Sequence, residues 1–131
     1  MTEMTQYTPG TFSWIDLATT DAEGAKQFYA NLFGWAAEDM PAGPDSVYTM
    51  LSKDGKSVAG LYAMNEEQRG MGMPPTWISY VSVADAQATV GKAKALGGQI
   101  IAEPFDVMDS GRMAVIQGPT GEGFNIWQPQ E

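Results

Sequence analysis

The feature of this sequence that most constrains its fold is an internal repeat. Two candidate helices, with their flanking residues, carry the same signature about one half-length apart in a chain of 131 residues. Self-similarity at a fixed spacing is typical of a structural unit that is used twice. The sequence therefore predicts two copies of one supersecondary module. The matches, each with its second member 64 positions after its first, are Asp21-Ala22 with Asp85-Ala86, Leu32 with Leu96, and Gly34 with Gly98.

The first half of the chain predicts a strand, a helix and then further strands. Alternating residues over Thr11–Thr19 predict the first strand. The helix that follows begins at Thr20 or Asp21, which can cap its first turn, and ends at Gly34. Its predicted buried face, at helical spacing, is Ala25, Phe28, Tyr29, Leu32 and Phe33. The strands expected next are a short one near Trp35–Met40, then Val47–Ser52 and Ser57–Met64, joined by the hairpin signal Asp54-Gly55.

The second half repeats this order after a segment rich in Gly, Met and Pro at Asn65–Thr76, which we interpret as a linker. We expect one domain over residues 1–131, with module one at about 10–64, the linker at about 65–76 and module two at about 77–129. The elements predicted for module two are a strand at Trp77–Val83, a helix at Asp85–Leu96 stopped by Gly97-Gly98, and strands at Gln99–Asp106, Arg112–Gln117 and Gly123–Gln128.

Composition narrows the chemistry that is open to the chain. It has no cysteine and no histidine, so disulfides, thiolate metal sites and histidine acid–base catalysis are excluded. Its formal charge of −9 disfavours nucleic acid and anionic membranes as partners. No apolar run approaches the roughly 20 residues that span a bilayer, and the start has no signal-peptide pattern, so we expect a cytoplasmic protein.

Two motifs resemble the glyoxalase and bleomycin-resistance family of the vicinal oxygen chelate superfamily, and the likeness runs from Gly10 to Pro129. The first motif extends from Trp14 to Trp35 and includes Phe28-Tyr29 and Leu32-Phe33-Gly34-Trp35. The second is the closing turn and strand at Gly118–Trp127. The resemblance implies an α+β fold in which two βαβββ modules form a cupped mixed sheet with helices on its outer face. It also implies that two chains pair as a homodimer.

The metal-binding positions of the resembling family hold poor ligands in this chain. Metal-dependent relatives place His, Gln or Glu at four points on the first and last strand of each module. The matching positions here are Trp14, Ile78, Asn125 and either Ala59 or Gly60. One neutral amide among apolar groups cannot replace the hydration shell of a divalent ion. We therefore predict no metal and no other cofactor.

Strand alternation predicts which side chains face the cup. If Ile15 and Leu17 point to the helix, Trp14 and Asp16 point to the opposite face, and the same parity applies in the second module. This lining of rings and a few polar groups suits a flat or extended organic ligand. The predicted ligand-binding residues are Trp14, Asp16, Tyr48, Met50, Tyr62, Ile78, Tyr80, Arg112, Asn125 and Trp127.

Several of these residues have a structural interpretation as well. Trp14 fills core or contacts ligand, and Asn125 binds ligand or serves as a satisfied sheet amide. Asp16, a carboxylate within a strand, is our catalytic candidate; the alternative is structural pairing, with Arg112 as its partner. Trp77 has the opposite parity to Ile78, so we expect it to pack on the helix side or to contact the linker.

Three functions remain open at this point. The first is metal-independent binding of a small aromatic or cationic molecule, as in the drug-sequestering, antibiotic-resistance branch of the family. The second is a lyase or isomerase of the glyoxalase family in which Asp16 or a tyrosine transfers a proton without metal. The third is a structural or regulatory partner whose pocket is filled by its own side chains. A fold alone does not decide between them.

Overall fold

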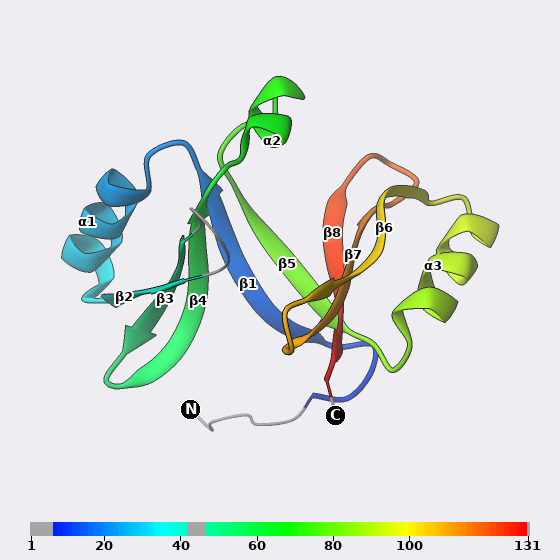
Figure 1. Ribbon diagram of the computed structural model, residues 1–131, viewed down its shortest axis with the longest axis horizontal. Coiled ribbons are helices and arrows are strands. Elements are labelled where there is room, and N and C mark those ends of the chain that lie inside the picture. The colour runs from blue at the N-terminus through cyan, green and yellow to red at the C-terminus, as the bar shows by residue number, and fades with distance from the viewer. Residues whose placement is uncertain (1–6, 42–46, 131) are drawn as a thin grey trace. The chain divides into compact units, whose positions relative to one another are not determined.

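The computed structural model describes residues 7–41 and 47–130, and within them the predicted βαβββ order occurs twice. Figure 1 labels each element along the chain. One short helix, α2, lies between the two repeats. The elements are β1 (Phe12–Thr19), α1 (Ala22–Phe33), β2 (Ala36–Pro41), β3 (Val47–Lys53), β4 (Lys56–Ala63), α2 (Glu66–Gly70), β5 (Thr76–Ser82), α3 (Ala86–Ala95), β6 (Gln99–Val107), β7 (Gly111–Gln117) and β8 (Gly123–Pro129).

The described residues form two compact units, which we call the first unit (15–77) and the second unit (7–14 with 78–130). In the first unit the strand order is β2-β3-β4-β1, and β1 pairs with β4 in parallel. In the second unit it is β5-β8-β7-β6, and β5 pairs with β8 in parallel. The other pairs in each unit are antiparallel. The α+β fold of two βαβββ modules is therefore confirmed.

Helix α1 begins and ends where the sequence predicts. The Asp21 side chain accepts a hydrogen bond from the Gly24 amide at 2.9 Å, which satisfies one of the free donors of the first turn. Gly34 ends the helix in the left-handed conformation, with φ of 76°, which glycine adopts without strain. In Figure 1, α1 lies along one face of the first unit's strands.

The predicted buried face of α1 is only partly right. A cluster of Leu17, Leu51, Ala59 and Leu61 forms the first unit's core, and α1 contacts it through the small residues Ala22 and Ala25 and through Tyr29. By contrast, Phe28, Leu32 and Phe33 are 48–57% exposed. The helix rests on a narrower contact than its apolar stripe predicts, because the rings of Trp35, just before β2, and Trp77 on β5 occupy part of the space beside Tyr29.

The second unit has a core of its own beneath α3. Val83, Ala86, Val90, Ala114, Ile116 and Ile126 are buried together. Asp85 caps α3 through the Ala88 amide at 3.1 Å, in the place that Asp21 holds in α1. The repeated aspartates are therefore the two helix caps, as the sequence repeat indicates.

The connections agree with the predicted turns except at the linker. Asp54 and Gly55 both have positive φ, 52° and 82°, which is the geometry of a tight hairpin between β3 and β4. The segment expected to be a linker contains α2, which a capping box of Asn65 and Gln68 begins. Among residues 7–41 and 47–130, no helix is long and apolar enough to cross a membrane.

The packing of the first unit generates a stability prediction. Leu61 is fully buried, so Leu61→Ala leaves a cavity and is expected to lower the free energy of unfolding by about 2–5 kcal/mol. Leu32 makes the matched control, because at 56% exposed its truncation is expected to change stability by about 0.5 kcal/mol or less. Urea unfolding of both variants measures the difference. Equal losses would show that the stripe on α1 is buried after all.

Candidate functional site

Strand register brings four of the predicted ligand-binding residues onto one face of the first unit. Residues that pair on neighbouring strands share a face of the sheet. Asp16 on β1 pairs with Gly60 on β4, and Gly60 also pairs with Met50 on β3. Tyr48 pairs with Tyr62 one step along the same strands. We call this surface, made by Asp16, Tyr48, Met50, Gly60 and Tyr62, the Asp16 face.

The Asp16 face is the one opposite α1. Leu17 and Leu61 alternate with Asp16 and Gly60 along β1 and β4, and both leucines belong to the core on which α1 packs. This confirms that the helix and Asp16 lie on opposite sides of these strands.

Asp16 lies beneath a tyrosine. Its side chain is buried, with the residue only 2% exposed, and the Tyr48 hydroxyl donates a hydrogen bond to its Oδ2 at 3.3 Å. A buried carboxylate is stabilised by donors of this kind, since it has lost its contact with water. A ligand on the Asp16 face therefore meets the negative charge of Asp16 close to the Tyr48 hydroxyl.

Gly60 makes room for this contact. A Cβ atom at position 60 would collide with the hydroxyl end of Tyr48. The absence of a side chain at Gly60 therefore leaves room for the Tyr48 hydroxyl to reach Asp16. Asp16 on β1 pairs with Gly60 on β4, and in the second unit Tyr80 on β5 pairs with Asn125 on β8. Gly60 and Asn125 therefore hold equivalent positions in the two units. Of the two residues considered for the family's ligand position, Gly60 is thus the equivalent one, and Ala59 lies in the core.

Tyr62 is held in place by α2. Gln68 Nε2 donates a hydrogen bond to the Tyr62 hydroxyl at 3.0 Å. The same glutamine closes the capping box of α2, where its Oε1 accepts from the Asn65 amide at 3.1 Å. Gln68 is not among the predicted site residues, although the spacing Asn65-x-x-Gln68 is a recognisable capping signal.

Burial raises the pKa of the Tyr62 phenol above its ordinary value of 10.0. The hydrogen bond from Gln68 opposes this rise, because it stabilises the phenolate, and the negative charge of Asp16 adds to it. Tyr62 is therefore a neutral hydroxyl that can donate a hydrogen bond over the whole physiological range.

The second unit carries three further candidates, Tyr80, Asn125 and Trp127, on one face of its own. Tyr80 pairs with Asn125 and Ser82 with Trp127, so Tyr80, Asn125 and Trp127 alternate away from the core residue Ile126. Tyr80 and Asn125 are buried. The Trp127 ring lies over Gly111, where a Cβ atom would meet it at 2.7 Å. Ile78 has the same parity in β5 as Tyr80, and Trp14 the same parity in β1 as Asp16; both are half-buried.

Arg112 lies on the other face. It pairs across the strands with Gln128, whose Oε1 accepts a hydrogen bond from the Ala86 amide of α3. Arg112 therefore points to the helix side, and its Nε donates to Asp106 Oδ1 at 3.0 Å. The alternative considered for Asp16, structural pairing with Arg112, is not what the arginine does: the antiparallel register of β6 and β7 puts Asp106 directly opposite Arg112.

The four positions that bind metal in related proteins do not suit a metal here. They hold an indole, an alkyl group and an amide, at Trp14, Ile78 and Asn125, and no side chain at Gly60. A divalent ion needs several charged or imidazole donors. In the part of the chain that the structure describes, no three Asp or Glu side chains gather in a group that could hold a metal ion. We derive no chemistry through a metal at these positions.

Comparison with known proteins places the chain in a family. The model of the Glyoxalase/Bleomycin resistance protein/Dioxygenase superfamily matches residues 11–126. A protein of Mycobacterium tuberculosis named "Putative glyoxylase CFP32" is 42% identical over 98% of this chain and 49% of its own length. The anthracycline biosynthesis protein DnrV of Streptomyces peucetius is 35% identical over 95% of this chain and 49% of its own. The chain thus spans about half the length of these relatives.

Solved structures show the same fold at low identity. The crystal structure of methylmalonyl-CoA epimerase from Mycobacterium tuberculosis has a TM-score of 0.67 and 16% identity, and the match covers 96% of this chain and 93% of the epimerase chain. The hypothetical protein BH1468 from Bacillus halodurans has a TM-score of 0.69 and 14% identity, over 92% and 95% of the two chains. Together with the family model and the relatives above 30% identity, these matches show that the chain belongs to the Glyoxalase/Bleomycin resistance protein/Dioxygenase superfamily.

Proposed function

We propose that this protein binds a small aromatic or cationic organic molecule against the Asp16 face, without a metal ion. The observation that carries the proposal is a buried carboxylate, Asp16, placed directly behind the Tyr48 hydroxyl and on the same face as Tyr62. The ligand contacts the two phenol rings and Met50, and the carboxylate supplies a fixed negative charge behind them.

The chemistry of this face favours a flat, positively charged or polarised ligand. Aromatic rings offer large contact area and attract cations at their faces, and a nearby carboxylate strengthens that attraction. The flexible thioether of Met50 adapts to ligands of different outline. The overall charge of −9 attracts a cation and repels an anion.

One of the relatives supports an aromatic ligand. The 35%-identical protein DnrV is named for anthracycline biosynthesis, and anthracyclines are polycyclic aromatic compounds. The extension of this chemistry to the present chain, which spans half of that relative, is part of the proposal.

Proton transfer is the second candidate function, and a specific contact favours it. The Tyr48–Asp16 hydrogen bond joins a potential acid to a potential base, while Tyr62 stays neutral and able to donate to an oxygen of the substrate. A lyase or isomerase would use Asp16, through Tyr48, to remove a proton next to a carbonyl group. The Tyr62 hydroxyl would stabilise the enolate oxygen that forms. In an isomerase the proton would then return to carbon, and in a lyase the enolate would expel a leaving group from the neighbouring carbon.

Substitution of Asp16 tests both functions. In Asp16→Asn the shape is kept and the charge is removed, so affinity for a cationic aromatic compound is expected to fall about tenfold, while a neutral analogue of the same outline binds almost as before. Isothermal titration calorimetry with such matched pairs measures this. Asp54→Asn, in the exposed hairpin turn, removes the same charge away from the face and is the control.

The outcome also separates binding from catalysis. Recovery of the ligand unchanged by mass spectrometry supports binding, and turnover that disappears in Asp16→Asn supports proton transfer. Equal affinity of wild type and Asp16→Asn for every cationic ligand in the panel, with no turnover by either, would refute the role of this face.

Tyr62 generates a pH prediction. Because its pKa is raised in the folded protein, the unfolded chain loses this proton first as the pH rises through about 10. The contribution of neutral Tyr62 to the free energy of unfolding is thus complete below about pH 10. It is lost as the pH rises from there to the pKa of Tyr62 in the folded protein. Tyr62→Phe is expected to remove this part of the decline in stability above about pH 10. Gln68→Ala is expected to steepen the decline, because it removes the hydrogen bond that lowers the pKa of Tyr62. Urea unfolding at several pH values measures the slopes; identical slopes in all three proteins would contradict the assignment.

Pairing of two chains remains a prediction of the resemblance to the family. Analytical ultracentrifugation at several protein concentrations tests it: a stable dimer gives about twice the monomer mass of 14.1 kDa. A species of monomer mass at all concentrations would refute it.

A further inference from the structure

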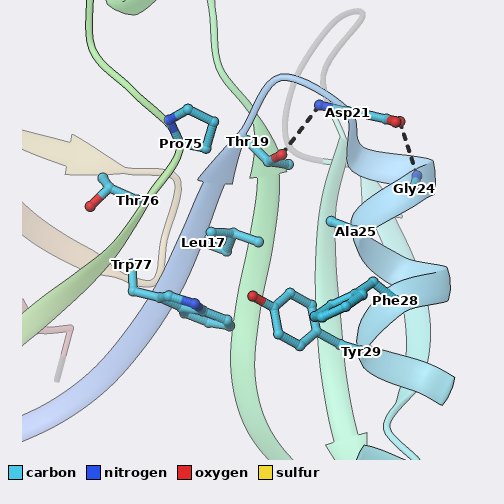
Figure 2. Close-up of a pocket in the computed structure, with 10 residues that line it drawn as sticks. All are labelled: Leu17, Thr19, Asp21, Gly24, Ala25, Phe28, Tyr29, Pro75, Thr76 and Trp77. Carbon is cyan, nitrogen blue, oxygen red and sulfur yellow. Dashed lines mark hydrogen bonds between the residues drawn. The ribbon is translucent and has the colours of Figure 1, made fainter. Parts of the chain in front are cut away.

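We propose a second small-molecule site in the first unit, on the helix side, which takes a planar aromatic cation. It is a hollow of about 420 Å³ between α1, the end of β1 and the segment at 75–77, and we call it the α1 hollow. Figure 2 shows the ten residues that line it. Leu17 and Thr19 of β1 form its floor, and both alternate with Asp16 along the strand, so the hollow and the Asp16 face lie on opposite sides of the sheet.

The hollow exists because the first turn of α1 directs only small residues toward it. Gly24 and Ala25 face it, and neither fills space that a larger residue would take. A Cβ atom at position 24 would collide with the Asp21 carboxylate that caps the helix. The space opens to solvent along the helix, so a ligand can enter it from the surface. The helix cap accounts for Gly24, and the space beside it is available to a ligand.

Three rings form the wall of the hollow. Trp77 and Tyr29 meet edge to face, with centroids 5.4 Å apart, and Phe28 meets Tyr29 in the same way at 5.0 Å. Figure 2 shows Trp77 reaching from β5 toward Tyr29 on α1. Trp35 stacks on Tyr29 at 5.6 Å and holds that ring from outside the hollow. A wall fixed in this way loses little conformational entropy when a flat ligand binds.

The exposure of Phe28 in the wall of the hollow also favours a planar aromatic ligand. Phe28 lines the hollow and is 57% exposed in the protein alone. A planar ring system that entered the hollow would remove this ring from water, and each Å² of apolar surface so buried favours binding by about 25 cal/mol. The sequence predicts Trp77 only as a packing residue and gives no sign of a hollow beside it.

The charge of the hollow decides which aromatic ligands it accepts. Asp21 is the one charged side chain among the ten lining residues. One of its oxygens accepts from the Gly24 amide, and a carboxylate has lone pairs for more than one donor. The helix dipole opposes a cation here with about half a positive charge, which is less than the full negative charge of Asp21.

The nearest lysine on α1 does not reverse this balance. Lys26 binds both Glu23 and Asp39, at 2.6 and 2.8 Å, so its charge is already compensated. A cationic ligand is thus favoured over a neutral one, and an anionic one is disfavoured. The proposal is independent of the function proposed for the Asp16 face, because the two sites share no residue.

The test uses N-methylacridinium, a permanent flat cation, and acridine, which has the same outline and is uncharged at mildly alkaline pH. The four tryptophans of the 15N-labelled protein give four indole N–H resonances. We expect N-methylacridinium to shift the Trp77 resonance most and to leave that of Trp127, in the second unit, almost unchanged. Asp21→Ser keeps a good helix cap but removes the charge, and is expected to weaken N-methylacridinium binding about fivefold to tenfold with little effect on acridine.

Filling the hollow gives an independent result. Ala25→Met places a flexible side chain in the space and should abolish the Trp77 shift for both dyes, whereas Ala30→Met, on an exposed helix position outside the lining, should not. A Trp77 shift that survives Ala25→Met overturns the proposal. So does binding that is lost in Asp16→Asn but kept in Asp21→Ser, because this would place both dyes on the Asp16 face. A Trp77 shift that depends on protein concentration without dye would show that a second copy of the chain covers the hollow.

Discussion

The parallel pairing of β1 with β4 is the constraint on which the first unit depends. It fixes Asp16 opposite Gly60 and Leu17 opposite Leu61, and since side chains alternate along a strand, this register assigns every residue of the two strands to a face. A slip of one residue would bury the carboxylate among the leucines under α1 and expose the leucines. The core and the candidate site are therefore two consequences of one register.

In both units a glycine leaves room for a large aromatic ring against the sheet. In the first unit the Tyr48 ring lies over Gly60, and in the second the Trp127 ring lies over Gly111. The glycines are on different strands of the two units, β4 and β7, so this is a shared solution rather than a repeated position. In each case a missing side chain lets an aromatic ring lie close to the backbone, where a larger residue would lift it away. The fixed place of the Tyr48 ring is what brings its hydroxyl within reach of Asp16.

Much of this arrangement was predictable from the sequence, because it follows from alternation and capping. The repeat located both helices and their aspartate caps, and strand parity put Asp16 on the face opposite the helix. Tyr48, Met50 and Tyr62 belong to the predicted lining, but their common face follows from the register of β3 with β4. What failed were inferences that depend on tertiary packing. The apolar stripe of α1 does not reveal that Trp35 and Trp77 crowd beside Tyr29, which leaves Phe28 and Leu32 exposed. Likewise, a partner for Arg112 is set by the register of β6 with β7, which the sequence leaves open.

Asp16 and Asp21 show how position decides the role of a carboxylate. They are five residues apart, yet one is buried behind a tyrosine on one side of the sheet and the other caps a helix on the opposite side. Asp16 is hydrogen-bonded to Tyr48 and raises the pKa of Tyr62, so a ligand on this face meets its negative charge from behind the Tyr48 hydroxyl. Asp21 remains accessible and can contact a ligand directly, although the amides of the first turn compete for it. A chain with no histidine and no cysteine thus has two different acidic, aromatic environments within a single βαβββ module, and their ligands need not be the same.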